Sequence, residues 1–350
     1  MKINTPLFSI IVIFFDEEEL LTRCLDSVRN QSFQDFQLIL VNDGSTDNSL
    51  TITKSYHSFF KNIDIVTLTN SGHGKARNEG MKLVRGKYVT FLDADDEFCS
   101  TALELFAKQI QETNADLVIS DFHSIDENLK NSLKTKWLSS YKSQMSSEDV
   151  LKILYYGGLT EPVWAKAFKT SIVNKIDFKE NMLFEDRCFV IEAILKSNSV
   201  SFLGKKLVYN YRRPNSSTRK TLDKKRITDA YHLFLNERDL LIQYTIFDQY
   251  KTQVYKNALD YLMDTYIIML VDSERIINLN ELRAHFSNTF SNYILNLKSD
   301  NIHFSLKNRI AIVLLQLPNS LGWKMTNLLI KALKKRRHKQ IEIIKNSVNK

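Results

Sequence analysis

Residues 88–96 read YVTFLDADD, and this stretch indicates the fold more clearly than any other. Its first part, Tyr88–Leu92, is apolar and rich in strand-forming residues, as expected for a strand buried on both faces of a parallel sheet. Its second part, Asp93–Asp96, places three carboxylates directly after that strand. In open α/β sheets, ligands bind beyond the carboxyl ends of the strands. The stretch therefore predicts a buried strand that delivers acids to a binding site.

The same pattern recurs on both sides of this stretch. Apolar runs predict strands at Phe8–Phe15, Phe36–Val41, Ile63–Leu68 and Ala115–Ser120. A second polar cluster, Asn42–Asp47, follows one of them. The segments between the strands have helical spacing, most clearly at Glu17–Asn30, Lys75–Val84 and Leu103–Thr113. This alternation predicts an α/β fold with an open, mostly parallel sheet and one site at its carboxyl edge.

The pattern changes near residue 220. Three long segments rich in Leu, Ile and Tyr predict helices at Lys224–Tyr244, Lys251–Val271 and Leu279–Leu297. We place a domain boundary near Ser217–Leu222, which gives a catalytic domain at 1–218 and a helical C-terminal region at 219–350.

Composition limits the classes of protein that remain. The 350 residues carry a formal charge of +8, and the three cysteines have no metal-binding spacing. The apolar run near the N-terminus is too short for a signal peptide, and no run reaches about 18 apolar residues, the length needed to span a bilayer. We therefore expect a cytoplasmic protein.

Much of the positive charge lies near the C-terminus. Residues 324–339 contain seven Lys or Arg and no acid, and apolar residues, among them Trp323, are interleaved with them. This mixture favours an anionic membrane surface over nucleic acid as the partner. We expect the segment Leu306–Lys339 to hold the protein on the inner face of the cell membrane. The alternative is a helix packed on the catalytic domain with a solvated basic tail.

Four groups of residues suggest chemistry, and two of them, Asp43 and Asp93–Asp96, lie at the predicted edge. The Asp93–Asp96 carboxylates suit Mg²⁺ or Mn²⁺, although a helix N-terminus also favours acids there. Asp43 is placed to accept a hydrogen bond from a base or ribose, or to form an ordinary turn. Arg77 is placed to pair with these acids or with phosphate, or to lie on the surface. The pair Glu185–Asp186 is either a general base or an exposed acidic pair.

Taken in order, these residues resemble the family 2 glycosyltransferases of the GT-A fold, in particular the small bacterial enzymes that build surface polysaccharides. The likeness covers about residues 7–218 and consists of nine short elements in the family's order. They lie at 9–18, 31–33, 40–47, 76–80, 86–88, 91–96, 164–166, 184–186 and 211–217.

The resemblance implies an inverting, metal-dependent hexosyltransferase with a GT-A nucleotide-sugar-binding domain. It would move a sugar from a nucleotide-diphosphate donor, usually a UDP-sugar, to a hydroxyl of a growing cell-surface glycan such as a capsule, lipopolysaccharide, exopolysaccharide or teichoic acid. Acceptors in such pathways are commonly lipid-linked. The implied cofactor is a divalent cation, Mn²⁺ or Mg²⁺.

The resemblance also assigns roles to single residues. Asp186 matches the catalytic base, with Glu185 beside it. Asp93, Ala94 and Asp95 match the DxD signature, in which Asp95 is the metal ligand and Asp93 lies nearer the ribose. The remaining matches are Asp43 at the base of the nucleotide, the backbone of Ile13, Phe15 and Glu17 around the nucleoside, Arg77 near the diphosphate, Trp164 and Lys166 near the sugar or acceptor, and Arg212 and Ser217 on a closing loop over the diphosphate.

The chain departs from the family in places. Residues 13–16 read IFFD where the family often has Pro-x-Tyr-Asn, so contacts through that Asn or Tyr side chain are in doubt. Lys75 replaces a small residue and could alter donor choice. A non-catalytic nucleotide-sugar-binding module or a membrane-bound scaffold is the alternative function. A dehydrogenase would need GxGxxG after the first strand, and this sequence has none there. A processive synthase would need spanning helices and a Gln-x-x-Arg-Trp motif, and the sequence has neither.

Overall fold

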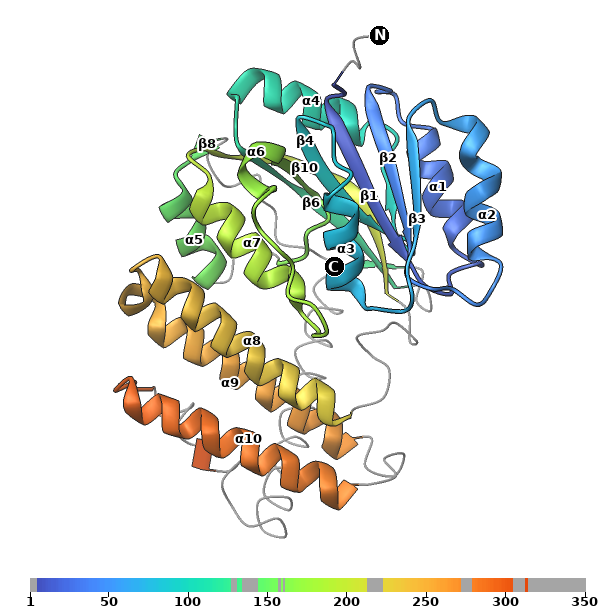
Figure 1. Cartoon of the computed structure of the whole chain (residues 1–350). Helices are drawn as coiled ribbons and strands as arrows, with labels where there is room; N and C mark the ends of the chain where they lie inside the picture. The colour runs from blue at the N-terminus through green and yellow to red at the C-terminus, as the bar shows by residue number, and fades with distance from the viewer. Residues whose placement is uncertain are drawn as a thin grey trace, which may run out of the picture. The chain divides into compact units, whose positions relative to one another are not determined.

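The computed structural model describes residues 5–126, 131–133, 144–156, 159, 161–212, 223–271, 279–304 and 312–313. The chain divides into two compact units, Met1–Thr218 and Arg219–Lys350. The first unit is built on one mixed sheet with helices on both faces, and the second is helical (Figure 1). The predicted fold class is confirmed: a mostly parallel α/β sheet, followed by C-terminal helices.

Four parallel strands form the N-terminal half of the sheet. They lie in the order β3 (Ile63–Thr67), β2 (Phe36–Asn42), β1 (Phe8–Phe14) and β4 (Tyr88–Asp93). Every residue of β1 and β2 is buried, which explains why both strands are mostly apolar along their length. All four strands were predicted from sequence within one or two residues of their observed ends.

The C-terminal half of the sheet is mixed. A short strand, β9 (Lys166–Lys169), lies between β4 and β6 (Leu117–Asp126) and is antiparallel to both. Beyond β6 lies β10 (Val200–Arg212), which is parallel to β6 and shifts register between Leu203 and Val208. Three short strands, all antiparallel to their neighbours, complete the sheet: β5 (Glu97–Phe98), β7 (Asn131–Leu133) and β8 (Gln144–Met145). The strand predicted at Ala115–Ser120 corresponds to β6, which begins two residues later and continues to Asp126.

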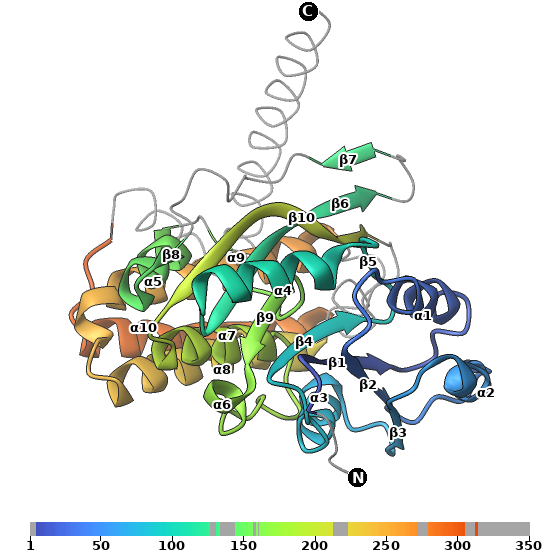
Figure 2. The same cartoon turned by 90° about the horizontal axis from the view of Figure 1, so that it is seen from above.

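Helices cover both faces of the sheet (Figures 1 and 2). One face carries α1 (Leu21–Arg29), α2 (Ser49–Ser55) with the short 3₁₀ helix η1 (Tyr56–Phe59), and α4 (Ala102–Thr113). The other carries α3 (His73–Met81), α6 (Thr170–Val173) and α7 (Glu185–Lys196), and α5 (Ser147–Tyr156) packs beside α7. On the α7 face the aromatic side chains of Phe91, Phe168, Phe178 and Phe189 form one cluster, in which Phe91 meets the other rings edge-on and Phe178 stacks on Phe189.

Close packing fixes the position of α3. A Cβ atom on Gly80 would come within 2.9 Å of Ile11 Cγ2, so only glycine allows the helix to lie this near β1. The side-chain amide of Asn78 donates to the carbonyl of Phe178 at 2.9 Å and accepts from its N–H at 2.8 Å. These contacts bind α3 to the sheet and to the segment that precedes α7.

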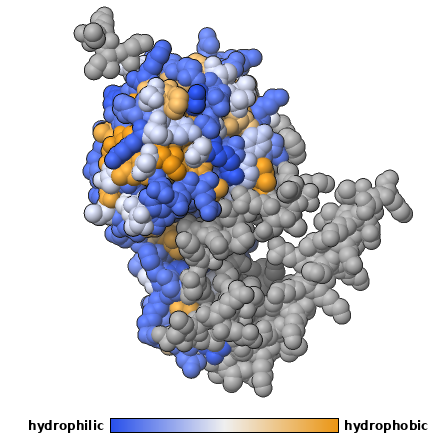
Figure 3. Space-filling view, turned by 90° about the vertical axis from the view of Figure 1, so that its right-hand side faces the viewer, coloured by the Kyte–Doolittle hydropathy of each residue, from blue (hydrophilic) through white to orange (hydrophobic). Residues whose placement is uncertain are grey.

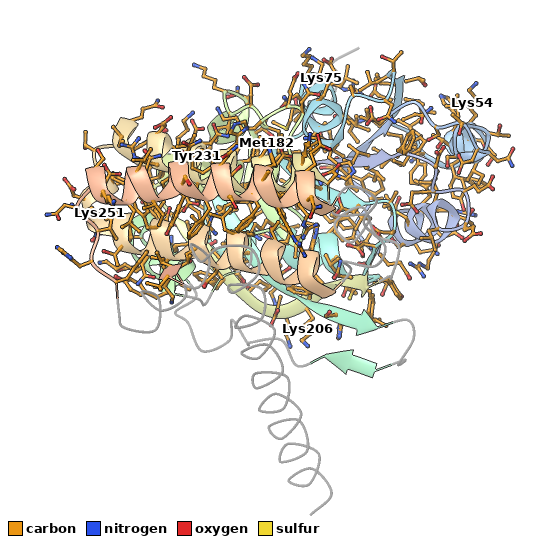
Figure 4. The ribbon with its side chains drawn as sticks, turned by 90° about the horizontal axis from the view of Figure 1, so that it is seen from below. Lys54, Lys75, Met182, Lys206, Tyr231 and Lys251 are labelled. Carbon is orange, nitrogen blue, oxygen red and sulfur yellow. The ribbon has the colours of Figure 1, made fainter. Side chains whose placement is uncertain are left out.

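The second unit contains α8 (Lys224–Gln243), α9 (Phe247–Val271) and α10 (Leu279–Ser299). The Asp300 carboxylate accepts from the Tyr255 hydroxyl at 2.6 Å and from Arg238 Nε at 2.9 Å, which ties the three helices together. Tyr231, labelled in Figure 4, lies on α8 and accepts a hydrogen bond from Asn296 on α10. No helix in the described parts of the chain is long and apolar enough to cross a bilayer. The predicted membrane segment Leu306–Lys339 lies outside the described residues, apart from 312–313.

Candidate active site

The carboxyl ends of β1, β2 and β4 meet at one edge of the sheet. Ile13 on β1 pairs in register with Val41 on one side and with Asp93 on the other. Asp43 follows the end of β2 by one residue, and its N–H donates to the Phe14 carbonyl at 2.9 Å. The parallel register therefore brings Ile13, Asp43 and Asp93 together, as the strand pattern predicted.

The loops that follow β1 and β2 are bonded to each other. Asp16 adopts a positive φ of 51°, and its carboxylate accepts the N–H of Thr46 at 2.7 Å. The N–H of Glu17 donates to Ser49 Oγ at 2.9 Å. Phe15 directly precedes Asp16, and 36% of its surface is exposed. The side of the first unit that carries α1 and α2 is otherwise largely hydrophilic, with smaller hydrophobic areas (Figure 3).

Asp43 is buried and holds the loop that leads into α3. One carboxylate oxygen accepts the N–H of Ser71 at 2.7 Å and its hydroxyl at 2.9 Å, and the other accepts the N–H of Gly72 at 2.8 Å. Asp43 therefore stabilises a loop, which is one of the two roles predicted for it from the sequence. A carboxylate has about four lone-pair sites, so it can still accept from a ligand.

Arg77 on α3 joins the two acidic motifs. Its guanidinium is buried, pairs with Asp93 Oδ1 at 3.0 Å and with Asp186 Oδ1 at 3.0 Å, and also contacts Glu185. Burial acts against the cation, but the carboxylates of Asp186, Glu185 and Asp93 outweigh it and raise the pKa of Arg77. Lys75, two residues earlier, points away to the surface and pairs with Glu79 and Glu180 (Figure 4).

Glu185 and Asp186 form the first turn of α7, where the helix dipole favours negative charge. The preceding Phe184 has a positive φ of 65°, which turns the chain sharply into the helix. Asp186 Oδ2 accepts the N–H of Val163 at 3.1 Å, and 19% of its side chain is exposed. Burial raises the pKa of Asp186, although the charge of Arg77 lowers it. An acid with a raised pKa at a site edge is a candidate proton acceptor.

The Asp93–Asp96 turn gathers its three carboxylates. One oxygen from each of Asp93, Asp95 and Asp96 lies within 4.8 Å of the others. Asp96 is buried, and its carboxylate accepts from the side chain of Asn210 and the N–H of Tyr211. Burial and the neighbouring acids raise the pKa of Asp96. Asp93 and Asp95 are only half-buried, and Ala94 between them packs into the core.

Arg23 braces this turn from α1. Its guanidinium donates to the carbonyl of Asp95 at 2.7 Å, pairs with Glu97 at 3.1 Å and stacks on the Tyr211 ring at 3.8 Å. The Tyr211 hydroxyl in turn donates to Glu97 at 2.6 Å. Arg212 ends β10 directly after this tyrosine, but its side chain lies outside the described residues, as does all of Ser217.

Trp164 and Lys166 are both buried. The Trp164 ring is buried and packs edge-on against Phe122, with ring centroids 4.7 Å apart. Lys166 is 1% exposed, and its ammonium donates to the carbonyl of Pro162 at 2.6 Å. Neither side chain forms an open surface at the site edge in this structure.

The sequence model of the family described as glycosyl transferase family 2 matches residues 9–176 of this chain. The matched segment contains the strand ends, Asp43, Arg77 and the Asp93–Asp96 turn described above. The first unit of the chain carries a family 2 glycosyltransferase domain. The resemblance recognised from the short motifs is confirmed, and the first unit of this glycosyltransferase has the GT-A fold.

Two relatives are similar to this chain in sequence, and one solved structure is similar to it in fold. The glycosyltransferase is 26% identical over 275 residues to putative glycosyltransferase EpsH of Bacillus subtilis. The matched region covers 76% of this chain and 75% of the relative. It is 31% identical over 202 residues to poly(ribitol-phosphate) beta-glucosyltransferase of Bacillus spizizenii. This matched region covers 55% of this chain and 30% of the relative. The crystal structure of Staphylococcus aureus TarS 1–349 in complex with UDP-GlcNAc superposes with a TM-score of 0.58 at 20% identity, covering 85% of this chain and 93% of that one.

Two residues beside the acidic pair, Arg187 and His73, had no role in the sequence prediction. Arg187, next to Asp186, is buried, contacts Glu161 and lies over the Tyr155 ring at 5.7 Å. His73 Nδ1 lies 3.8 Å from Glu185. The only sequence signal for Arg187 was its position directly after the acidic pair. His73 carried no signal, because its neighbour Glu185 comes from a distant segment.

Proposed function

We propose that this glycosyltransferase is an inverting enzyme that moves a sugar from a nucleotide-diphosphate donor, a UDP-sugar, to a hydroxyl of a cell-surface glycan. The observation that carries the proposal is the buried Arg77, whose guanidinium holds Asp93 and Asp186 at 3.0 Å each. The acid that would lie at the donor and the acid that would act as base are thereby fixed in one site. Sugar transfer itself follows from the family 2 domain of the first unit.

Asp186 is the proposed general base. The acceptor hydroxyl must lose a proton as it attacks the anomeric carbon, and a half-buried carboxylate with a raised pKa is suited to take it. Both acids of α7 pair with Arg77, but Glu185 is buried whereas Asp186 keeps 19% of its side chain exposed, so Asp186 is the carboxylate of this pair that can meet an acceptor. One base and no carboxylate nucleophile predict single displacement with inversion. The anomeric configuration of the product, read from its proton coupling constant, tests this step.

The acidic turn fits a divalent cation. Mg²⁺ and Mn²⁺ prefer carboxylate oxygens, and the turn offers three within 4.8 Å. Asp95 and Asp93 would hold the ion, because the carboxylate of Asp96 is turned inward to Asn210 and Tyr211. When bound, such an ion stabilises the negative charge of a departing diphosphate.

The donor would lie along the ends of β1 and β2. Asp43 would accept from the base, the backbone of Ile13, Phe15 and Glu17 would line the nucleoside, and Arg77 would approach the diphosphate from α3. Arg212 and Ser217 are proposed to reach the diphosphate, and Trp164 to shape the sugar site from beneath. TarS, whose fold this chain shares, binds UDP-GlcNAc in its crystal structure, which supports a uridine donor.

Replacing Asp43 with alanine should weaken UDP binding by about 1–3 kcal/mol, the usual effect of losing a hydrogen bond to a charged group. The affinity for CDP should change much less, because cytosine has no N–H at the position where uracil has one. Titration calorimetry with both nucleotides measures the two effects, and a screen of nucleotide sugars by nucleotide release identifies the donor.

This comparison separates reading of the base from support of the loop. Asp43 also holds Ser71 and Gly72, so its loss could disturb the site generally. Equal weakening of UDP and CDP would show that Asp43 supports the loop only. The Ser71→Ala variant, which removes one of the bonds to Asp43 and keeps the carboxylate, is the matched control and should keep the preference for UDP.

We further propose that the C-terminal segment holds the enzyme on the cytoplasmic membrane face, where a lipid-linked acceptor would be available. The support is its composition, in which residues 324–337 contain six cations together with apolar residues. Each cation near an anionic surface contributes about 1 kcal/mol.

Truncation after Phe304 should abolish binding to anionic vesicles and preserve the folded units. This site retains Asp300, which bonds to Arg238 and Tyr255, and the buried Ile302. Sedimentation with vesicles of phosphatidylglycerol measures the binding, and vesicles of phosphatidylcholine are the control. If full-length and truncated chains sediment equally in low salt, the segment is not a membrane anchor.

A further inference from the structure

One peptide group connects Lys166 with the proposed base. The ammonium of Lys166 donates to the carbonyl of Pro162 at 2.6 Å. The N–H of the next residue, Val163, donates to Asp186 Oδ2 at 3.1 Å. The Pro162 carbonyl and the Val163 N–H belong to the same peptide bond, so the cation, the peptide and the carboxylate form one continuous chain of hydrogen bonds.

Such a chain is stronger than its separate bonds. A cation at the carbonyl oxygen polarises the peptide, which makes its N–H a better donor to the carboxylate at the other end. The arrangement is buried: Lys166 is 1% exposed, and Val163 is fully buried. In this low-dielectric surrounding the polarisation and the direct attraction between the two charges are only weakly screened.

Lys166 is not arranged to bind a substrate. Its ammonium is covered by protein and directed to the Pro162 carbonyl. By contrast, Asp186 keeps 19% of its side chain exposed at the site edge. The structure therefore separates a group that can meet the acceptor from a cation that lies behind it.

We propose that Lys166 is a positioning residue that orients and keeps ionised the Asp186 carboxylate through the Pro162–Val163 peptide. This inference rests on the proposed role of Asp186 as base and adds a residue that controls it. The chemical step is unchanged: the acceptor proton goes to Asp186, and Lys166 holds the carboxylate in the orientation and charge state that receive it.

The charges around the pair fix the sign of the effect. Asp186 is faced by Arg77 from α3, by its neighbour Glu185, and by Lys166 from β9, and both cations lower its pKa. Lys166 is faced by Asp186 and by Glu161, which itself contacts Arg187. Burial lowers the pKa of Lys166 to about 8, despite these acids, so the ammonium is mostly charged at neutral pH and loses its proton above that value.

Replacing Lys166 with methionine, which removes the ammonium and keeps an unbranched apolar side chain of similar shape, tests this role. Loss of a nearby opposite charge should raise the pKa of Asp186. The acid limb of the kcat profile should move to higher pH by the same amount, so the loss of kcat should be greatest at low pH. The KM for the donor should stay unchanged.

The control is Lys169→Met, which removes another lysine of β9 whose ammonium pairs with Asp116, away from Asp186. This variant should keep the wild-type pH profile. A raised donor KM in Lys166→Met with an unmoved acid limb would show that Lys166 binds the donor, and the positioning role would be wrong.

A titration without substrates separates this inference from the proposed function. With ¹³C-labelled aspartate carboxyls, the Asp186 resonance is assigned by its loss in Asp186→Asn and followed with pH. In the wild type it should shift a second time as Lys166 loses its proton, near the pKa of about 8, and this second step should be absent in Lys166→Met. A single step in the wild type would overturn the coupling even if the enzyme transfers sugar. Two steps in a protein that transfers no sugar would leave the coupling intact and remove the proposed function.

Discussion

Replacing Asp186 with asparagine should lower kcat for sugar transfer by about 10²-fold or more, the usual scale for loss of a general base. The amide has the same size and can keep the hydrogen bond from Val163, which the carboxylate accepts at 3.1 Å. It cannot accept the proton of the acceptor hydroxyl. Donor affinity should therefore remain nearly unchanged, and steady-state kinetics combined with titration of UDP measure the two quantities separately.

The role of Asp186 as base also predicts how activity depends on pH. Burial raises the pKa of Asp186 above the usual value of an aspartate, and a protonated carboxyl cannot act as base. Activity of the wild type should fall as the pH drops through this raised pKa, whereas the small residual rate of Asp186→Asn should not follow that titration.

A matched control lies on the same helix. Glu192 on α7 pairs with Lys196 near the surface, and Glu192→Gln should retain wild-type kcat. A loss of donor affinity in Asp186→Asn as large as the loss of kcat would show that Asp186 binds the donor and that another group is the base.

The strands that build the site could be predicted because each is buried on both faces. β1, β2 and β4 are apolar along nearly their whole length, which no exposed helix or loop would be. β9 was missed, because it is only four residues long and reads Lys-Ala-Phe-Lys. Its first lysine is buried by contacts with the Pro162–Val163 turn, which no periodicity in the sequence reveals.

The strand pattern could predict that Asp43 and Asp93 share a site, but it could not predict that Asp186 joins them. Asp43 and Asp93 lie together because parallel strands end at one edge, a rule that needs only the strand pattern. The ion pair between Arg77 and Asp186 joins residues more than 100 positions apart and depends on the sharp turn at Phe184. Only the resemblance to a family placed Asp186 there, and the catalytic roles stay predictions.

The acidic turn shows how burial changes the meaning of a motif. Three neighbouring acids look equivalent in sequence. In the structure Asp96 is turned inward and accepts from Asn210 and Tyr211, so it stabilises the turn. Asp93 pairs with Arg77, and the Asp95 backbone is held by Arg23. The half-buried Asp95 side chain is thereby presented by a braced backbone, which agrees with a role as the chief metal ligand.

Replacing Asp95 with alanine should reduce sugar transfer to about a hundredth of the wild-type rate or less. A bound divalent cation contributes several kcal/mol to charge stabilisation at a departing diphosphate, and about 3 kcal/mol corresponds to roughly 10²-fold in rate. Excess chelator should reduce the wild-type rate equally, and added Mn²⁺ should restore the wild type but not the variant. Nucleotide release measures the rate, and the electron paramagnetic resonance signal of free Mn²⁺ measures binding.

The control for charge is Asp64→Asn. Asp64 on β3 pairs with Arg85 and Gln37, away from the acidic turn, and its replacement should leave Mn²⁺ binding and turnover unchanged. Binding should be tested in the presence of UDP, because a diphosphate supplies further oxygen ligands to the ion. Full wild-type activity in excess chelator, or unchanged Mn²⁺ binding in Asp95→Ala, would remove the metal from this site. The turn would then be a structural element in which Arg77 and Arg23 balance three carboxylates, and Arg77 would remain as the cation next to the diphosphate.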